Sequence, residues 1–299
     1  MPRIRDGELL ADRLIVFTRY PRPGHTKTRL VPRLGAEQAA NLHARMTEHI
    51  AATASHFADQ ETAAVEVCHE GGGTDQMKQW LGEGFAYTSQ VEGDLGRRMA
   101  CAFQRAFEEG TSRVVLVGSD IPGITTDLLA EAFSAVPQAG LVLGPAKDGG
   151  YYLIGIDRSV ADTAIESLFN DIAWGTDRVL AETLFRANQA GLAPVLLREL
   201  ADIDRPEDLP EGWLEGDGLG AISDGMFSNG CVSVIIPTLN EAGNIARSVT
   251  SARRGKNVEV IAVDGGSHDE TVAIVNRLGI EVVESAAGRA NQMNAGARA

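Results

Sequence analysis

Twice in this chain, a short and fully apolar run that predicts a buried strand leads to an aspartate. The run Val114–Val117 leads to Asp120, and the run Val258–Val263 leads to Asp264. Parallel strands buried on both faces are continuously hydrophobic, and open α/β sheets bind ligands beyond the carboxyl ends of their strands. A carboxylate there can hold a divalent cation or a ribose hydroxyl. Because Asp also begins turns and caps helices, the surrounding residues must decide its role.

The order of the predicted elements indicates an α/β fold with a mainly parallel sheet and helices on both faces. Short apolar runs predict the strands, and apolar residues at helical spacing predict the helices. The expected strands of the first part are Leu14–Phe17, Val65–Cys68, Val114–Val117, Leu141–Leu143 and Tyr151–Ile156. The expected helices run from about 37 to 57, along Leu95, Met99, Phe103 and Phe107, and from Thr125 or Thr126 to Val136.

Glycine content and charge divide the chain into two domains. Residues 210–230 contain six glycines and no basic residue, which is typical of a linker between a first domain, 1–209, and a second, 231–299. The second domain begins as strand, helix, strand, helix, strand, over Val232–Ile236, about 241–253, Val258–Val263, about 269–278 and Ile280–Val283, and continues in a helix-like tail.

Composition and charge exclude several classes of protein. The net charge is −14, and residues 231–299 balance 7 basic against 7 acidic side chains, so the acidic excess lies in the first 230 residues and argues against a nucleic-acid surface. No run approaches the roughly 18 apolar residues of a membrane span, and the amino terminus lacks a secretory core, so we expect a cytoplasmic protein. Cys68, Cys101 and Cys231 are far apart and suggest neither a disulfide framework nor a zinc site.

A basic loop stands out in the acidic first domain. Residues 19–29 include Arg19, Gly24, Lys27 and Arg29, between the first strand and the first helix. Cationic side chains can neutralise phosphate oxygens, and Gly24 lets the backbone approach a phosphate. The loop lacks the spacing of a Walker motif, and its alternative role is a solvated turn. The six histidines show no metal spacing, and those of the Ala-rich helix are expected to serve packing or the surface.

Several ordered blocks of the first domain resemble the bacterial family of small nucleotide-diphospho-sugar transferase-like proteins, similar to 2-phospho-L-lactate guanylyltransferase. The resemblance spans about residues 12–209. Its blocks are Phe17–Pro21 with Pro23–Gly24 and Lys27–Leu30, Gly93–Met99, Gly118–Pro122, Lys147–Gly155 and Asp202–Leu209. The resemblance implies the GT-A, or nucleotide-diphospho-sugar transferase, fold. It departs from the guanylyltransferases after the first strand, where Pro21, Pro23 and Gly24 replace a Gly-rich loop, so the nucleotide stays open.

The same resemblance implies a metal site and a set of roles. Asp120 and Asp204 match its two metal ligands, and two carboxylates with phosphate oxygens and water suit Mg²⁺ or Mn²⁺. Lys27 and Arg29 would assist as charge develops on the phosphate. Asp148 would lie near the substrate or serve only the turn that it begins, and Asp208 is expected to cap a helix.

The second domain resembles the beginning of a family 2 glycosyltransferase. The resemblance rests on Val232–Glu241, Val260–Thr271 and Gly288–Ala297, the last similar to arsenosugar-biosynthesis-type enzymes. It implies that Glu241 and Asp264 hold the nucleoside of a UDP-sugar and that Arg289 reaches its diphosphate. Such an enzyme continues with a metal-binding Asp-x-Asp and an acceptor-binding half. We therefore expect a truncated second GT-A half-domain that binds a nucleotide at most, or only packs.

These features favour a transferase that uses a nucleotide-activated donor and a small-molecule acceptor. Glycosyl transfer from a nucleotide-sugar comes first. Nucleotidyl transfer, in which a nucleoside triphosphate and a phosphorylated small molecule react with release of pyrophosphate, is the alternative. A non-catalytic nucleotide-binding module is the third reading, and the sequence leaves the base, the sugar and the acceptor open.

Overall fold

The computed structural model of the 299-residue chain describes residues 11–209, 232–252 and 258–297. The chain divides into two compact units, Met1–Ile222 and Ser223–Ala299, called unit 1 and unit 2 below. The predicted linker, 210–230, and Cys231 lie outside the described residues. Among the described residues, no helix is both long and apolar enough to cross a membrane.

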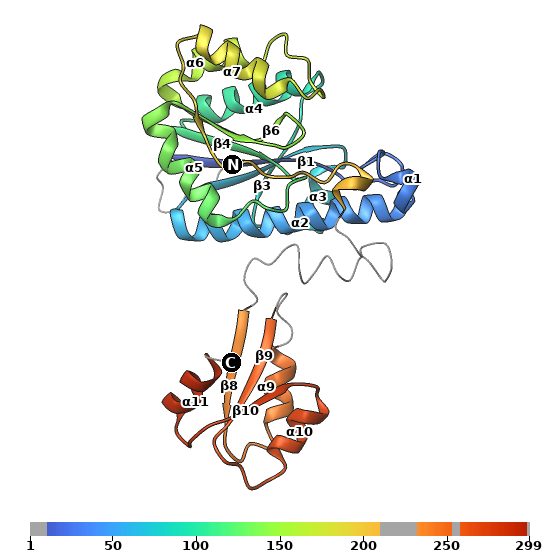
Figure 1. The fold of residues 1–299 in the computed structure, drawn as a ribbon, viewed down its shortest axis with the longest axis vertical. Helices are drawn as coiled ribbons and strands as arrows, with labels where there is room; N and C mark the ends of the chain where they lie inside the picture. The colour runs from blue at the N-terminus through green and yellow to red at the C-terminus, as the bar shows by residue number, and fades with distance from the viewer. Residues whose placement is uncertain (1–10, 210–231, 253–257, 298–299) are drawn as a thin grey trace. The chain divides into compact units, whose positions relative to one another are not determined.

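Unit 1 contains a mainly parallel sheet with helices on both faces (Figure 1). Its strand order is β3-β2-β1-β4-β6-β5-β7, and only β6 runs antiparallel to its neighbours, β4 and β5. The strands are β1 (Asp12–Arg19), β2 (Ala64–Glu70), β3 (Ala86–Ser89), β4 (Arg113–Gly118), β5 (Leu141–Pro145), β6 (Tyr151–Asp157) and β7 (Val195–Leu196). The helices are α1 (Val31–Leu34), α2 (Ala36–Glu61), α3 (Thr74–Leu81), α4 (Leu95–Glu108), α5 (Thr126–Ala139), α6 (Ala161–Leu168) and α7 (Val179–Gln189), with 3-10 turns at Arg158–Val160 and Pro206–Asp208.

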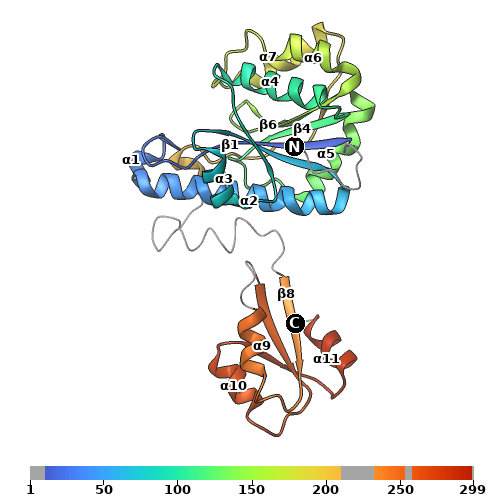
Figure 2. The same ribbon diagram turned by 180° about the vertical axis from the view of Figure 1, so that it is seen from behind.

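Alternation along the central strands builds two hydrophobic cores. Leu14 and Val16 of β1 face α2 and α5, where Phe57 stacks on Phe133. Residues of the opposite parity, among them Ile15, pack with α4 and α6 on the other face. Figure 2 shows the same two helical layers from behind. Both faces of the central strands are therefore buried, as their continuous apolar sequence predicts.

The chain leaves β1 toward β2 on one side and reaches β4 on the other, so a topological switch point lies between β1 and β4. Ligands of open α/β sheets bind at such points, outside the carboxyl ends of the strands. The basic loop follows β1 and Asp120 follows β4. The fold therefore brings the two main sequence signals of the first domain to one place.

Unit 2 is a three-stranded parallel sheet in the order β10-β9-β8. Val260 and Ala262 of β9 pack with α9 and α10, whereas Gly296 of α11 lies close to Ile235 and Val263 on the other face. The elements are β8 (Val232–Thr238), α9 (Ile245–Ala252), β9 (Val258–Asp264), α10 (Thr271–Arg277), β10 (Glu281–Glu284) and α11 (Arg289–Gly296).

Candidate functional site

Lys27 lies at the centre of the candidate site in unit 1. Its side chain is 3% exposed, and its ammonium is 3.1 Å from Asp120 Oδ1 and 3.5 Å from Asp204 Oδ1. It also donates a hydrogen bond of 2.5 Å to the carbonyl oxygen of Ile203. Lys27 has a φ of 50°, in the left-handed region, so the loop turns sharply at the residue that carries this amine. The cation thus joins the loop after β1 to the segment around residue 204.

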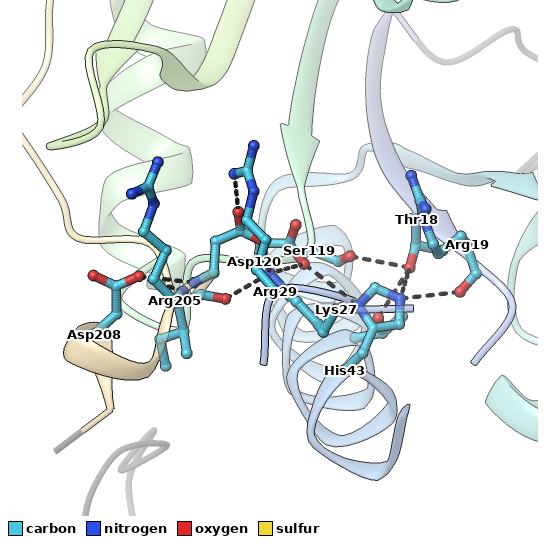
Figure 3. Close-up of polar contacts among 12 residues, drawn as sticks. Thr18, Arg19, Lys27, Arg29, His43, Ser119, Asp120, Arg205 and Asp208 are labelled. Carbon is cyan, nitrogen blue, oxygen red and sulfur yellow. Dashed lines mark hydrogen bonds and ion pairs between the residues drawn. The ribbon is translucent and has the colours of Figure 1, made fainter. Parts of the chain in front are cut away.

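Asp204 binds a second cation of the same loop. Its Oδ2 is 2.5 Å from Arg29 Nη1. Asp208 Oδ2 accepts hydrogen bonds from the backbone N–H groups of Asp204 and Arg205, at 3.0 and 2.7 Å, which is the capping role expected for Asp208. Figure 3 shows Asp208 at Arg205 and Lys27 at Asp120.

His43 of α2 contacts Asp120 and lines a pocket with it. Its Nδ1 lies 3.4 Å from Asp120 Oδ1, and its Nε2 lies 3.0 Å from the carbonyl oxygen of Arg19 (Figure 3). We expected the histidines of this helix to serve packing or the surface, but His43 touches a candidate site residue. The signal in the sequence is its place within the buried stripe that includes Leu42 and Met46.

The charges around Asp120 favour its ionised form. Burial of the carboxylate acts to raise its pKa, but the Lys27 ammonium and the His43 ring outweigh this effect and hold the pKa of Asp120 well below its usual range. Only one side of the group is enclosed, because 49% of the side chain stays exposed and Asp120 lines a pocket. An ionised carboxylate therefore faces the space where a ligand would lie.

The pocket beside Asp120 has a volume of about 360 Å³. Arg19 and Arg98 line it, and both pair with Glu70, at 3.3 and 3.0 Å. Two aromatic residues also line it, because Tyr151 meets Trp174 edge to face with ring centroids 6.4 Å apart. The pocket thus offers charged groups for a diphosphate and an apolar wall for a ring. Arg98 and Tyr151 belong to blocks that carry the family resemblance, but the sequence alone assigns neither residue to the site.

Asp148 and Asp202 also line this pocket. Asp148 Oδ1 accepts a hydrogen bond of 2.9 Å from the N–H of Gly150, so this residue shapes its turn and also faces the pocket. Burial raises the pKa of Asp202, and the nearby carboxylate of Asp148 adds to the rise.

In the basic loop, Gly24 has a φ of 76° and leaves the space beside its backbone open, as a phosphate approach requires.

The two predicted metal ligands differ in availability. Asp120 Oδ1 makes ion-pair contacts but no hydrogen bond, whereas both oxygens of Asp204 face cations. Among the described residues, no group of three or more His, Cys, Asp or Glu side chains is arranged for a metal. Mg²⁺ commonly takes one or two carboxylates and completes its shell with phosphate oxygens and water, and this donor set fits that chemistry. Oδ1 of Asp120 pairs with Lys27 and His43, so its Oδ2 is the oxygen that a metal can take without breaking an ion pair.

In unit 2, the carboxylate of Asp264 is turned toward its own loop. Its Oδ2 accepts hydrogen bonds from the N–H groups of Gly266 and Ser267, at 2.9 and 2.8 Å, and its Oδ1 accepts one from Ser267 Oγ at 2.5 Å. Burial of the Asp264 carboxylate acts to raise its pKa, but these hydrogen bonds outweigh burial and lower the pKa. The backbone N–H of Glu241 donates to Thr271 Oγ1, and Arg289 is exposed at the start of α11. The roles of these three residues remain predictions.

The switch-point pocket and the sheet define the class: unit 1 has the GT-A fold of nucleotide-diphospho-sugar transferases. Residues 36–176 match a family described as "uncharacterized protein conserved in bacteria (DUF2064)", and residues 233–299 match glycosyl transferase family 2. The chain therefore joins a DUF2064 region to a glycosyl transferase family 2 region, and this glycosyltransferase-like fusion is an enzyme of the transferase class.

The solved structures similar to this chain include a "putative nucleotide-diphospho-sugar transferase" from Desulfovibrio desulfuricans G20. The two share 29% identity with a TM-score of 0.61, over 73% of this chain and 97% of the other. Weaker matches include 4-diphosphocytidyl-2C-methyl-D-erythritol synthase from Anaerococcus prevotii, at 11% identity, 66% and 93% coverage and a TM-score of 0.46. Glucosyl-3-phosphoglycerate synthase from Mycobacterium tuberculosis, in complex with Mn²⁺ and UDP, matches at 13% identity with a TM-score of 0.43, over 69% of this chain and 80% of the other. These two are too distant to indicate a substrate. A search of curated proteins by sequence finds no match.

Proposed function

We propose that the chain transfers a glycosyl group from a nucleotide-sugar to a small acceptor at the pocket beside Asp120. The observation that carries the proposal is the placement of Lys27, whose ammonium lies within 3.5 Å of both Asp120 and Asp204 at the switch point of the sheet. A departing nucleoside diphosphate gains negative charge, and a fixed cation stabilises that charge without reorganising. Arg19 and Arg98, in the same pocket, would bind the phosphates.

The proposed donor site includes a divalent cation, Mg²⁺ or Mn²⁺. Asp120 would hold it, and Asp204 would join after releasing one of its two cations. Such an ion supplies Lewis-acid neutralisation of the phosphate oxygens. Lys27 would then remain close to the same phosphates, and the aromatic wall of Tyr151 and Trp174 would pack against the base or the sugar. Glu241, Asp264 and Arg289 are proposed to contribute a nucleotide-binding surface in unit 2.

Nucleotidyl transfer is the second candidate, and a specific observation favours it too. Lys27 and Arg29 follow one another on a loop that a pair of carboxylates holds in place. Two cations beside a metal site can stabilise charge on an α-phosphate as an acceptor displaces pyrophosphate. The two candidates share the site and differ in the bond that breaks.

Calorimetry and turnover assays on the full chain test these proposals. UDP, GDP, CTP and GTP are titrated with and without Mg²⁺, and release of nucleoside diphosphate from nucleotide-sugars is measured beside release of pyrophosphate from the triphosphates. We expect Asp120→Asn to abolish Mg²⁺-dependent binding, and Lys27→Ala to lower turnover roughly a hundredfold or more. Asp162→Asn, an exposed position in the first turn of α6, is the matched control.

The outcomes separate the candidates. Diphosphate release from a nucleotide-sugar supports glycosyl transfer, whereas pyrophosphate release supports nucleotidyl transfer. If Asp120→Asn leaves Mg²⁺-dependent binding intact, the metal site is wrong. If nucleotides bind without any turnover, the chain is a binding module.

A further inference from the structure

A second pocket, of about 510 Å³, adjoins the one beside Asp120. The two pockets share four lining residues, Asp148, Gly175, Thr176 and Asp202. The second pocket is otherwise built from the turn at Lys147, the loop at Asp177 and the segment from Ala201 to Asp208, with Arg29 from the basic loop. A molecule in this pocket can therefore meet a donor in the first pocket at the shared residues.

The second pocket is lined mainly by residues with charged side chains. Its basic side chains are Arg29, Lys147 and Arg205, and its acidic side chains are Asp148, Asp177, Asp202, Asp204 and Asp208. Three of the acids already have partners, because Asp204 pairs with Lys27 and Arg29, Asp208 accepts two backbone N–H groups, and Asp148 Oδ1 accepts one from Gly150. The carboxylates of Asp148, Asp177 and Asp202 line the pocket together with exposed cations.

This mixture of charges selects among ligand classes. An apolar molecule would take several charged groups out of water without offering them partners, which is unfavourable. A small anion would meet more carboxylates than cations, and like charges repel. A hydroxyl group both donates and accepts hydrogen bonds, so a polyhydroxylated molecule can satisfy carboxylates and guanidinium groups together.

We propose that the second pocket is the acceptor site and that the acceptor is a small uncharged polyhydroxylated molecule, a sugar or a polyol. This inference rests on the proposed glycosyl transfer. Asp148 lies where the pockets meet, and its Oδ1 is bound by the N–H of Gly150, which leaves Oδ2 for the acceptor. A hydroxyl proton passes to Asp148 as the hydroxyl oxygen bonds to the anomeric carbon of the donor. The bond from that carbon to the diphosphate oxygen breaks, and the nucleoside diphosphate leaves with the electron pair.

Six-carbon acceptors that differ in charge and in hydroxyl content test the proposal on the full chain. With the nucleotide-sugar that the turnover assay selects, glucose and sorbitol are compared with gluconate, glucose 6-phosphate and cyclohexanol. We expect only glucose and sorbitol to stimulate diphosphate release above slow hydrolysis. Saturation-transfer NMR with the same compounds, in the presence of the matching nucleoside diphosphate, measures binding independently of turnover.

Variants confined to the second pocket provide the matching evidence from the protein side. Asp177→Ala and Arg205→Ala line this pocket but not the first, so we expect each to raise the acceptor KM roughly tenfold while the donor KM stays unchanged. Lys78→Ala, an exposed position on α3, is the control. Circular dichroism checks that each variant folds.

Failure of this inference differs from failure of the proposed function. If the chain binds and hydrolyses the donor, three results would each overturn the acceptor site alone. These are a preference for gluconate or glucose 6-phosphate, no polyol binding by NMR, and an unchanged acceptor KM in both variants. Donors that neither bind nor react would overturn the proposed function and this inference together.

Discussion

At the scale of single residues, His43 is the side chain whose replacement tests most directly how the pocket is held. Its side chain is 4% exposed, and its ring contacts both Asp120 Oδ1 and the carbonyl oxygen of Arg19. Leucine fills a similar volume but offers no polar atom, so we expect His43→Leu to lower the free energy of unfolding by about 1–3 kcal/mol. Urea denaturation measures the change. His56→Leu, an exposed histidine of the same helix, is the control, and equal stability of His43→Leu and the unchanged chain would contradict the supporting role.

The sequence predicts part of this site but does not reveal the contact that His43 makes. Asp120 and the basic loop could be predicted, because each follows a strand and the carboxyl ends of parallel strands share one edge. The approach of Asp204 was implied by a family resemblance, and the structure shows it beside Lys27. His43 is a single polar residue in a buried helical stripe, and only the packing of α2 beneath the sheet reveals that this stripe passes the end of β4.

At the scale of elements, Gly96 controls how closely α4 approaches the loop that carries Trp174. A Cβ atom at Gly96 would overlap the carbonyl oxygen of Phe169 and lie 2.7 Å from the Trp174 ring. We therefore expect Gly96→Ala to lower the midpoint of thermal unfolding and to cost about 1–3 kcal/mol, as overpacking does in a filled core. Scanning calorimetry measures it.

A second glycine provides the control for this packing. Gly84 is exposed, and a Cβ there meets nothing within 4 Å, so Gly84→Ala should leave the unfolding midpoint nearly unchanged. If Gly96→Ala and Gly84→Ala unfold alike, then α4 does not depend on close approach at Gly96. Because Trp174 also lines the pocket beside Asp120, the proposed function predicts that a shifted α4 weakens nucleotide binding as well.

Most elements were predictable from apolar periodicity. The direction of β6, however, follows from the length of the turn that joins it to β5. β5 and β6 are joined by the short turn 146–150, and a parallel pair requires a crossover of a dozen or more residues, so β6 must run antiparallel to β5. β3 and β7 were not predicted, because β3 has no fully buried position and β7 spans only Val195–Leu196, which is exposed. Such strands depend on pairing with their neighbours rather than on their own sequence.

At the scale of the whole molecule, the two units differ in the size of their cores. Unit 1 buries apolar residues on both faces of a seven-stranded sheet. The described core of unit 2 is smaller: six buried residues, Ile245, Val249, Val260, Ala262, Val275 and Ile280, form one cluster, and Ile261 and Val263 are buried as well. Small domains bury a smaller fraction of their surface and are less stable. We therefore expect unit 2 to open at a lower free energy than unit 1.

Hydrogen-exchange mass spectrometry on the full chain tests this difference, because amides report the free energy of the opening that exposes them. We expect the amides of β9 to exchange faster than those of β1 and β4. Val260→Ala, within the core of unit 2, should destabilise that unit by about 2 kcal/mol and speed exchange in β9 roughly thirtyfold, with β4 unchanged. Val115→Ala, in the core of unit 1, should speed exchange in β4 and leave exchange in β9 unchanged. If each substitution instead speeds exchange in both sheets, the two units unfold as one cooperative body, and the smaller core of unit 2 does not set its stability.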